Sequence, residues 1–319
     1  MPAISATAPG KIILFGEHAV VYGQPAIAVP VNQGRARAVI SARPDQPRGW
    51  IHLQAPDIGL ENNWENFPRV HPLIVVINGV LNAAGIDQPP ALTVRVTSTI
   101  PVAAGLGSGA AVSVAIIRAL SEFLGRPFSD KEISQLAFEV EKLHHGTPSG
   151  IDNTVITYEK PIYFIKDSIE KPGKMEVFPV SKPFTIVIAD TGTPSPTAAV
   201  VGDVREAWQK DRITFESLFE SAGGIVNQAR AAIETGDNTA LGPLMNENQD
   251  ILEKIGVSSG KLALLIQAAR QAGALGAKLS GAGRGGNMIA LATRETAGEI
   301  ADALSTAGAT STIITTVNG

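Results

Sequence analysis

The sequence predicts an α+β protein of two domains, and three observations support this. The chain has 319 residues, more than one average domain contains. Short β-rich segments occur between longer apolar segments with helical spacing. Glycine-rich stretches join several of these segments, and no internal repeat is found. We place the change of domain near residue 180, which gives an N-terminal domain of residues 1–180 and a C-terminal domain of residues 181–319.

In the N-terminal part, strands are predicted where apolar and polar residues alternate or where a short apolar run stands alone, at 11–15, 35–42 and 91–98. Two apolar helices are predicted between and after these strands, over 72–85 and 110–125, each ended by a glycine. Ser129 and Glu132 form a capping-box pattern, so a third helix is expected to start there and to stop near His145.

Two hairpin-like strands are expected next, over 155–165 and 175–180, followed by a β-rich run at 185–190. The second half is dominated by predicted helices, over 198–235, 238–254 and 259–272. The chain then closes with two strands around a glycine loop at 274–292, a helix, and a last strand at 311–317.

Composition excludes several classes of protein. The chain has no cysteine, which rules out disulfides, thiolate metal sites and cysteine nucleophiles. Its net charge of -4 comes without a Lys/Arg-rich block, so we expect neither nucleic acid nor an anionic membrane as a partner. No leader-like or membrane-spanning apolar run is present, and we therefore expect a cytoplasmic protein that acts on small molecules.

A glycine-rich loop follows the strand predicted at 91–98 and opens a helix. Gly105, Gly107 and Gly109 let backbone N–H groups approach an anion, and the helix that follows adds the positive end of its dipole. The small residue Ala110 allows close packing under the loop. Phosphate binding is the functional interpretation, and a tight turn without ligand is the structural one.

A dinucleotide site is a further alternative, because residues 105–110 and 281–286 both satisfy G-x-G-x-x-G/A. The context argues against it. The first helix leads into a second helix rather than a parallel strand, and the second match joins two strands. A Walker A sequence and the protein-kinase strings are absent.

Three separate segments carry a family resemblance. These are APGKIILFGEHAVVYGQPAIAVPV, PVAAGLGSGAAVS and KLSGAGRGGNMIALA, which together resemble the three motifs of the GHMP kinases in order and spacing. GEHAVVYG with HHGTPSGIDN most resembles the mevalonate kinases of that family, and the galactokinase string G-R-x-N-x-I-G-E-H is absent. The resemblance implies a ribosomal-protein-S5-like N-terminal domain and a ferredoxin-like C-terminal domain with extra helices.

The resemblance also implies roles for particular residues. Asp152 would be the base that accepts the substrate hydroxyl proton, and Lys11 its electrostatic partner. From its own sequence context, Asp152 would lie on a rigid turn; an Asx-turn or capping role is the alternative. Glu141 lies one residue off the apolar stripe of its helix and would bind Mg²⁺ together with Ser108, unless it is a solvated helix-face carboxylate.

The remaining implied positions form two groups. Nucleotide phosphates would be held by the backbone at Ala104, Gly105, Leu106, Gly107, Ser108, Gly109, Ala110, Gly281, Gly283 and Gly285. Glu17, His18 and Thr197 resemble substrate-pocket residues. Two departures stand out: Gly109 replaces a serine that would help to ligate Mg²⁺, and Arg284 replaces a frequent glycine, where it would contact phosphate or cover the loop.

The implied reaction is ATP-dependent phosphorylation of the primary hydroxyl of mevalonate, in isoprenoid precursor synthesis, with ATP and Mg²⁺ as cofactors. Other activities stay open at this point: a phosphomevalonate or sugar kinase, a ligand sensor of the same fold without catalysis, and a dinucleotide oxidoreductase. A homodimer is expected only from the habit of the family and from the frequency of symmetric oligomers.

Overall fold

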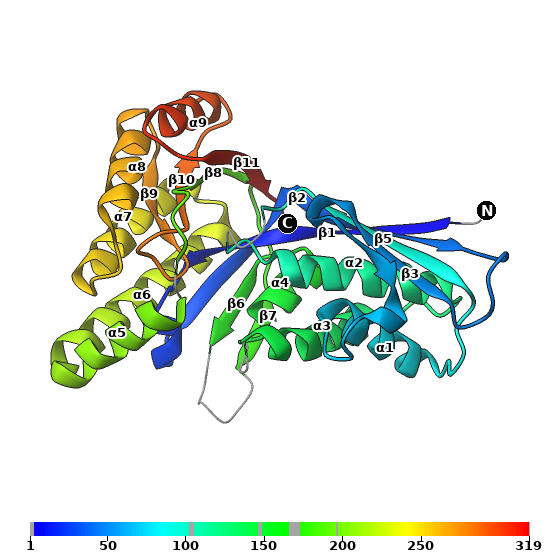
Figure 1. Ribbon diagram of the computed structural model, residues 1–319. Coiled ribbons are helices and arrows are strands. Elements are labelled where there is room, and N and C mark those ends of the chain that lie inside the picture. The colour runs from blue at the N-terminus through cyan, green and yellow to red at the C-terminus, as the bar shows by residue number, and fades with distance from the viewer. Residues whose placement is uncertain (1–2, 102–104, 146–148, 166–172, 196, 319) are drawn as a thin grey trace. The chain divides into compact units, whose positions relative to one another are not determined.

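The computed structural model describes residues 3–101, 105–145, 149–165, 173–195 and 197–318 (Figure 1). It divides into two compact units, neither of which is one continuous stretch. Unit 1 is formed by residues 1–10, 34–102 and 107–159, and unit 2 by residues 11–33, 103–106 and 160–319. Strands β1 (Ala3–Phe15) and β2 (Pro25–Ala42) contribute residues to both units. The division into functional domains of residues 1–180 and 181–319 stays a prediction.

The sheet of unit 1 combines the second half of β2 with three shorter strands, β3 (Ile51–Ala55), β4 (Leu60–Asn63) and β5 (Leu92–Ser98). They follow the order β4-β3-β5-β2. β5 runs antiparallel to β2, from Ala36 opposite Ser98 to Ala42 opposite Leu92, and parallel to β3. Short 3-10 turns, Pro56–Ile58 and Trp64–Asn66, flank β4.

The helices of unit 1 pack against one another, as Figure 1 shows. They are α1 (Pro72–Ala84), α2 (Ser108–Phe123), α3 (Asp130–His145) and α4 (Ile151–Tyr158). Gly85 ends α1 with φ +68°, and the Ser129 hydroxyl and Glu132 carboxylate form the predicted capping box. The prediction of a strand over 155–165 is partly wrong, because residues up to Tyr158 belong to α4 and only Ile162–Ile165 form a strand. A buried helical face, including Val155 and Ile156, outweighs the β propensity of these residues.

Unit 2 contains an antiparallel sheet in the order β11-β8-β10-β9. Its strands are β8 (Phe184–Asp190), β9 (Gly276–Ser280), β10 (Asn287–Ala292) and β11 (Ser311–Val317). With helices between β8 and β9 and between β10 and β11, this is the β-α-β-β-α-β connection of a ferredoxin-like fold, as expected from the resemblance. The first half of β2 pairs with β6 (Ile162–Ile165), which pairs with β7 (Lys174–Val177).

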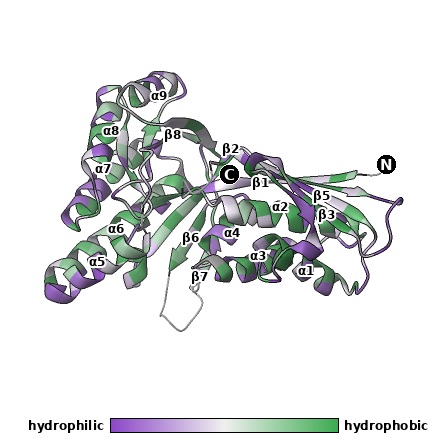
Figure 2. Ribbon diagram, in the orientation of Figure 1, coloured by the Kyte–Doolittle hydropathy of each residue, from purple (hydrophilic) through white to green (hydrophobic). Residues whose placement is uncertain are grey.

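The helices of unit 2 are α5 (Thr197–Lys210), α6 (Arg212–Thr235), α7 (Asn238–Lys254), α8 (Gly260–Gln271) and α9 (Ala297–Thr306). The helix predicted over 198–235 is two helices, since the Asp211 carboxylate accepts a hydrogen bond from the Thr214 amide and caps α6. α7 and α8 pack on β9, and α9 packs on β8 and β11. These helices carry both apolar and polar segments in Figure 2, as expected for helices with one buried face.

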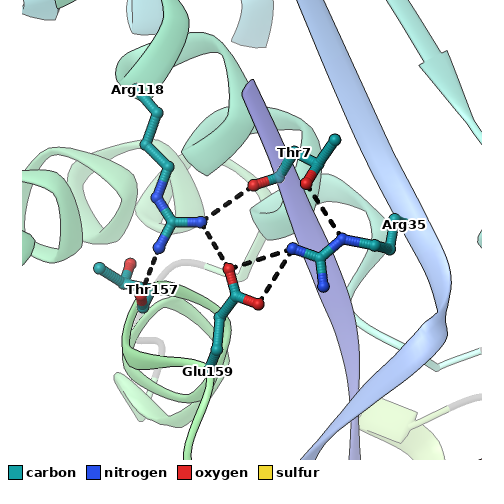
Figure 3. A network of polar contacts seen from close by, with 5 residues as sticks. All are labelled: Thr7, Arg35, Arg118, Thr157 and Glu159. Carbon is teal, nitrogen blue, oxygen red and sulfur yellow. Dashed lines mark hydrogen bonds and ion pairs between the residues drawn. The ribbon is translucent and has the colours of Figure 1, made fainter. Parts of the chain in front are cut away.

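A polar network in unit 1 joins the far ends of α2 and α4 to the two long strands (Figure 3). Glu159, which caps α4 with φ +53°, accepts hydrogen bonds from Arg118 of α2 at 2.8 Å and from Arg35 of β2 at 3.0 Å. Arg118 also donates to the backbone carbonyls of Thr7 and Thr157. The network therefore fixes the C-terminal parts of α2 and α4, whose N-terminal ends carry the glycine-rich loop at 105–109 and Asp152.

In the described ranges, no helix is both long enough and apolar enough to cross a lipid bilayer.

Candidate active site

The N-terminus of α2 has the geometry of an anion-binding loop. Gly107 caps the helix in the left-handed region, with φ +72°, and the helix begins at Ser108. Ala110 is buried beneath the loop, as expected, whereas Ser108 is partly exposed and Gly109 is exposed. The first backbone N–H groups of a helix have no partner within the helix, so they and the helix dipole favour a phosphate here. Ala104, also predicted for this loop, lies outside the described residues.

Glu141 of α3 faces this helix N-terminus. Its side chain is buried, at 5% exposure, which agrees with the predicted inward orientation and not with a solvated helix face. A Cβ atom added at Gly109 would lie 3.9 Å from Glu141 Oε1. The structure thus brings a buried carboxylate to the point where the first turn of α2 begins.

Asp152 lies in the first turn of α4, with Gly150 as the N-cap at φ +85°. The predicted turn is therefore the start of a helix, although the glycine before it supplies the rigid turn geometry. Asn153, the next residue, is buried and donates through Nδ2 to the Ser134 hydroxyl at 2.8 Å and to the Ser134 carbonyl at 3.0 Å. This contact fixes the start of α4 against α3.

Replacing Asn153 with alanine is expected to lower the free energy of unfolding by about 1–3 kcal/mol, because it removes a buried donor that bonds to both the hydroxyl and the carbonyl of Ser134. Under the role that the resemblance implies for Asp152, it is also expected to lower kcat, since the start of α4 loses its tie to α3. Urea unfolding and steady-state kinetics measure the two effects. Ser134→Ala, which leaves the carbonyl bond in place, should cost less on both counts; equal or larger losses in that variant would contradict this assignment.

In unit 2, a backbone hydrogen bond joins Lys11 to residues 105–106, the part of the first glycine-rich loop that belongs to this unit. The Lys11 amide donates to the Leu106 carbonyl at 2.9 Å, and the Lys11 residue is buried at 9% exposure. Gly105 has φ +73°, and a Cβ atom added there would lie 3.8 Å from Asn287 Nδ2. Residues of all three sequence motifs thus lie close together within this unit.

Glu17 and His18 are both buried, and both contact the third motif. The Glu17 carboxylate forms an ion pair with the Lys278 ammonium. Burial raises the pKa of Glu17 and lowers the pKa of Lys278, and the attraction between the two groups acts against both changes. His18, at φ +59°, bonds through Nε2 to the Ala282 carbonyl at 2.8 Å.

Burial also lowers the pKa of His18, so its ring is neutral at pH 7. Since a carbonyl can only accept, Nε2 carries the ring proton and Nδ1 is left as an acceptor. The imidazole therefore has an acceptor atom to offer a hydroxyl group.

The glycine loop between β9 and β10 is tightly constrained. A Cβ atom added at Gly283, where φ is +83°, would lie 2.1 Å from the Val257 carbonyl oxygen, and one at Gly285 would lie 2.5 Å from the Thr193 carbonyl oxygen. Only glycine fits these two positions. A Cβ atom added at Gly281 would meet no atom of the described residues within 4 Å, so the loop is not tightly packed at this position.

Arg284, the unusual residue of this loop, forms an ion pair with Asp203 of α5 and donates to the Gly256 carbonyl at 3.3 Å. These contacts favour the second of its two predicted roles, in which it covers the loop.

The segment before α5 packs on the same loop. The Gly286 amide donates to the Thr193 carbonyl at 2.8 Å, and the Ser195 hydroxyl donates to the Gly283 carbonyl at 2.7 Å. Thr197 begins α5 two residues later and is exposed. The structure therefore connects residues 193–197, predicted to lie on the substrate side, to the loop 281–286, predicted to hold phosphate.

The predicted residues fall into two sets. Unit 1 holds Gly107, Ser108, Gly109, Ala110, Glu141 and Asp152; unit 2 holds Lys11, Glu17, His18, Gly105, Leu106, Thr197, Gly281, Gly283 and Gly285. Sequence reasoning missed Asn153 and Lys278. Asn153 had a signal in its position next to Asp152. For Lys278 the signal is a single charged residue in the short strand GAKLS, where every other residue is small or apolar.

Comparison with known proteins agrees with the three motifs. Residues 73–160 match the family model "GHMP kinases N terminal domain", and residues 229–310 match "GHMP kinases C terminal". A protein of Thermococcus gammatolerans named mevalonate kinase is 39% identical over 326 aligned positions, covering 96% of this chain and 94% of that protein.

Two solved structures are also similar over nearly their whole length. The crystal structure of L. major mevalonate kinase in complex with R-mevalonate has a TM-score of 0.83 at 32% identity, covering 98% of this chain and 95% of that one. The Methanococcus jannaschii mevalonate kinase has a TM-score of 0.83 at 25% identity, covering 99% and 98%. Identity at this level over the full chain, with both family domains in order, leads to one conclusion: the chain belongs to the GHMP kinase family.

Proposed function

We propose that this protein is a mevalonate kinase, which transfers the γ-phosphoryl group of ATP to the primary hydroxyl of mevalonate in isoprenoid precursor synthesis. The observation that carries the proposal is the 39% identity to a protein of that name over 96% of this chain. The structure with R-mevalonate bound, 32% identical over nearly the whole chain, supports the same substrate.

Asp152 is proposed to accept the proton of the substrate hydroxyl as the new O–P bond forms, and Lys11 to stabilise the oxygen as it becomes negative. In phosphoryl transfer the protein contributes mainly positioning and electrostatic stabilisation. The N–H groups at the start of α2 and the glycine loop 281–286 are proposed to hold the nucleotide phosphates. His18 Nδ1, left as an acceptor, is proposed to receive a hydrogen bond from a substrate hydroxyl, with Glu17 and Thr197 also on the substrate side.

Mg²⁺ fits the residues that are present. Among the described residues, no group of three or more His, Cys, Asp or Glu could hold a metal ion. Mg²⁺ in kinases needs no such group, because it is held by one or two carboxylates, substrate phosphates and water. Glu141, buried beside the start of α2, is the proposed carboxylate, with Ser108 as a second ligand. When bound, the ion would offset negative charge on the phosphates.

Replacing Gly109 with serine is expected to lower the Mg²⁺ concentration needed for half-maximal activity several-fold. The added Cβ atom would lie 3.9 Å from Glu141 Oε1, an ordinary contact, and the hydroxyl would add an oxygen ligand beside this carboxylate. A Mg²⁺ titration of activity at fixed ATP measures the effect. Gly109→Ala is the matched control, since it adds the same Cβ atom without the hydroxyl. If both variants show the same Mg²⁺ dependence as the wild type, Glu141 is not the carboxylate that binds Mg²⁺.

The proposed reaction is tested by identifying its product. With ATP, Mg²⁺ and R-mevalonate, ³¹P NMR is expected to show one new phosphomonoester signal coupled to the protons of the terminal methylene carbon. A signal from the tertiary alcohol ester, or release of inorganic phosphate alone, would contradict the proposal.

A further inference from the structure

The strand β9 and the loop that follows it contact the β1 side of unit 2 at every second residue. The Lys278 ammonium pairs with the Glu17 carboxylate, and the Ser280 hydroxyl donates to the Ile13 carbonyl at 2.7 Å. The Ala282 carbonyl then accepts from His18 Nε2 at 2.8 Å. Because side chains two residues apart in a strand lie on the same face, Lys278 and Ser280 both point toward the segment that ends β1.

The ion pair is the most deeply buried of these contacts. The side-chain exposure is 0% for Lys278 and 1% for Glu17, and the Lys278 ammonium also donates to the Leu279 carbonyl at 2.6 Å. A buried ion pair contributes little net stability, because desolvation of the two charges offsets their attraction, and an apolar pair of similar volume often does as well. Fold stability is therefore a weak reason for placing a lysine in the middle of this strand.

The two ends of the glycine loop are held by different contacts. Its later part is held from the other side, where Gly286 bonds to Thr193 and the Arg284 amide donates to the Val257 carbonyl at 2.7 Å. Its beginning, at Gly281 and Ala282, follows directly on the strand that carries Lys278. The position of Gly281 thus depends on where the ion pair holds β9, together with the Ser280 and His18 contacts on either side of it.

We propose that Lys278 is a positioning residue: its ion pair with Glu17 fixes β9 against the end of β1 and so sets the loop 281–286 in the position that binds nucleotide phosphate. This inference rests on the assignment of that loop to phosphate under the proposed function. It gives Glu17 a second role, as the partner that holds Lys278 in place, beside its proposed place on the substrate side.

The test needs a variant that loses the ion pair without leaving one charge buried alone. The double variant Glu17→Gln with Lys278→Met removes both charges and keeps both side-chain lengths, so it is expected to fold. Gln249→Met is the matched control. Gln249 is also fully buried, and its Oε1 accepts from the Leu279 amide of the same strand at 2.9 Å, but it holds β9 to α7 and not to β1.

Dissociation constants for a nonhydrolysable ATP analogue with Mg²⁺, measured by calorimetry without mevalonate, give the primary readout. The double variant is expected to bind the analogue about tenfold or more weakly at an unchanged melting temperature, while Gln249→Met melts lower and binds as the wild type does. Glu17→Asp, which keeps both charges and withdraws the carboxylate by one methylene, should also weaken binding. Because mevalonate is absent, loss of a substrate contact by Glu17 does not affect this readout.

Wild-type affinity for the analogue in the double variant would overturn the inference, as would an equal loss of affinity in Gln249→Met. If the double variant does not fold, Glu17→Asp decides in the same way. Failure of the proposed function is a separate result, since it would show as a wild-type enzyme that binds the ATP analogue but does not phosphorylate mevalonate.

Discussion

Replacing Asp152 with asparagine is expected to lower kcat by about 10²–10⁴-fold, the usual loss when a general base is removed. Asparagine keeps the size of the side chain but cannot accept the hydroxyl proton. The KM for mevalonate and the affinity for ATP should change little, since the lost interaction is made in the transition state. Steady-state kinetics with both substrates varied in turn separates these effects.

Asp130→Asn is the matched control for this variant. Asp130 also lies in the first turn of a helix, α3, but it is exposed. Both substitutions remove a carboxylate that interacts favourably with a helix dipole, and only the one at Asp152 should affect turnover. Activity that survives in Asp152→Asn within about threefold would remove this residue from the mechanism.

Replacing Lys278 alone with methionine is expected to have the largest effect on stability, a loss of about 3–5 kcal/mol at pH 8, because the Glu17 carboxylate is then buried without its counter-charge. The double variant with Glu17→Gln should recover most of this loss, since no charge remains to be desolvated. Urea unfolding of both variants measures the difference. Equal stability of the single and double variants would show that the ion pair is not desolvated.

The loss in Lys278→Met should depend on pH in a defined direction. Burial raises the pKa of Glu17 above its ordinary value of 4.5, whereas the Lys278 ammonium acts to lower it. Without this ammonium, the pKa of Glu17 in the folded protein should be higher still. A carboxyl group whose pKa is raised by folding lowers the free energy of unfolding by its full amount above the folded pKa. This loss becomes smaller as the pH falls and disappears near 4.5, where the group is also protonated in the unfolded chain. The difference in unfolding free energy between wild type and Lys278→Met should therefore be smaller at pH 5.5 than at pH 8.

Much of the fold follows from local patterns in the sequence. The apolar run that ends at Gly85 and the capping box of Ser129 with Glu132 predict α1 and the start of α3 because the physical cause lies within a few residues. The helix at Ile151–Tyr158 is not predicted because its residues have β propensity, and the packing that makes them helical involves α2 and α3, which lie outside the segment itself.

The site divides in the same way. The loop glycines and the inward orientation of Glu141 could be predicted from motif and helical periodicity, and the structure agrees with both. The partner of Glu17 could not be predicted, because Lys278 is 261 residues away in the sequence and no periodic pattern relates the two residues. The tie of Asn153 to Ser134 also depends on how α4 packs on α3.

The most direct test of the account is coupled ADP release by the wild-type protein with Mg·ATP and a panel of alcohols: mevalonate, phosphomevalonate, homoserine and galactose. The account predicts turnover with mevalonate and background rates with the other three. Turnover with another alcohol and none with mevalonate would contradict it, leaving a GHMP kinase with a different substrate.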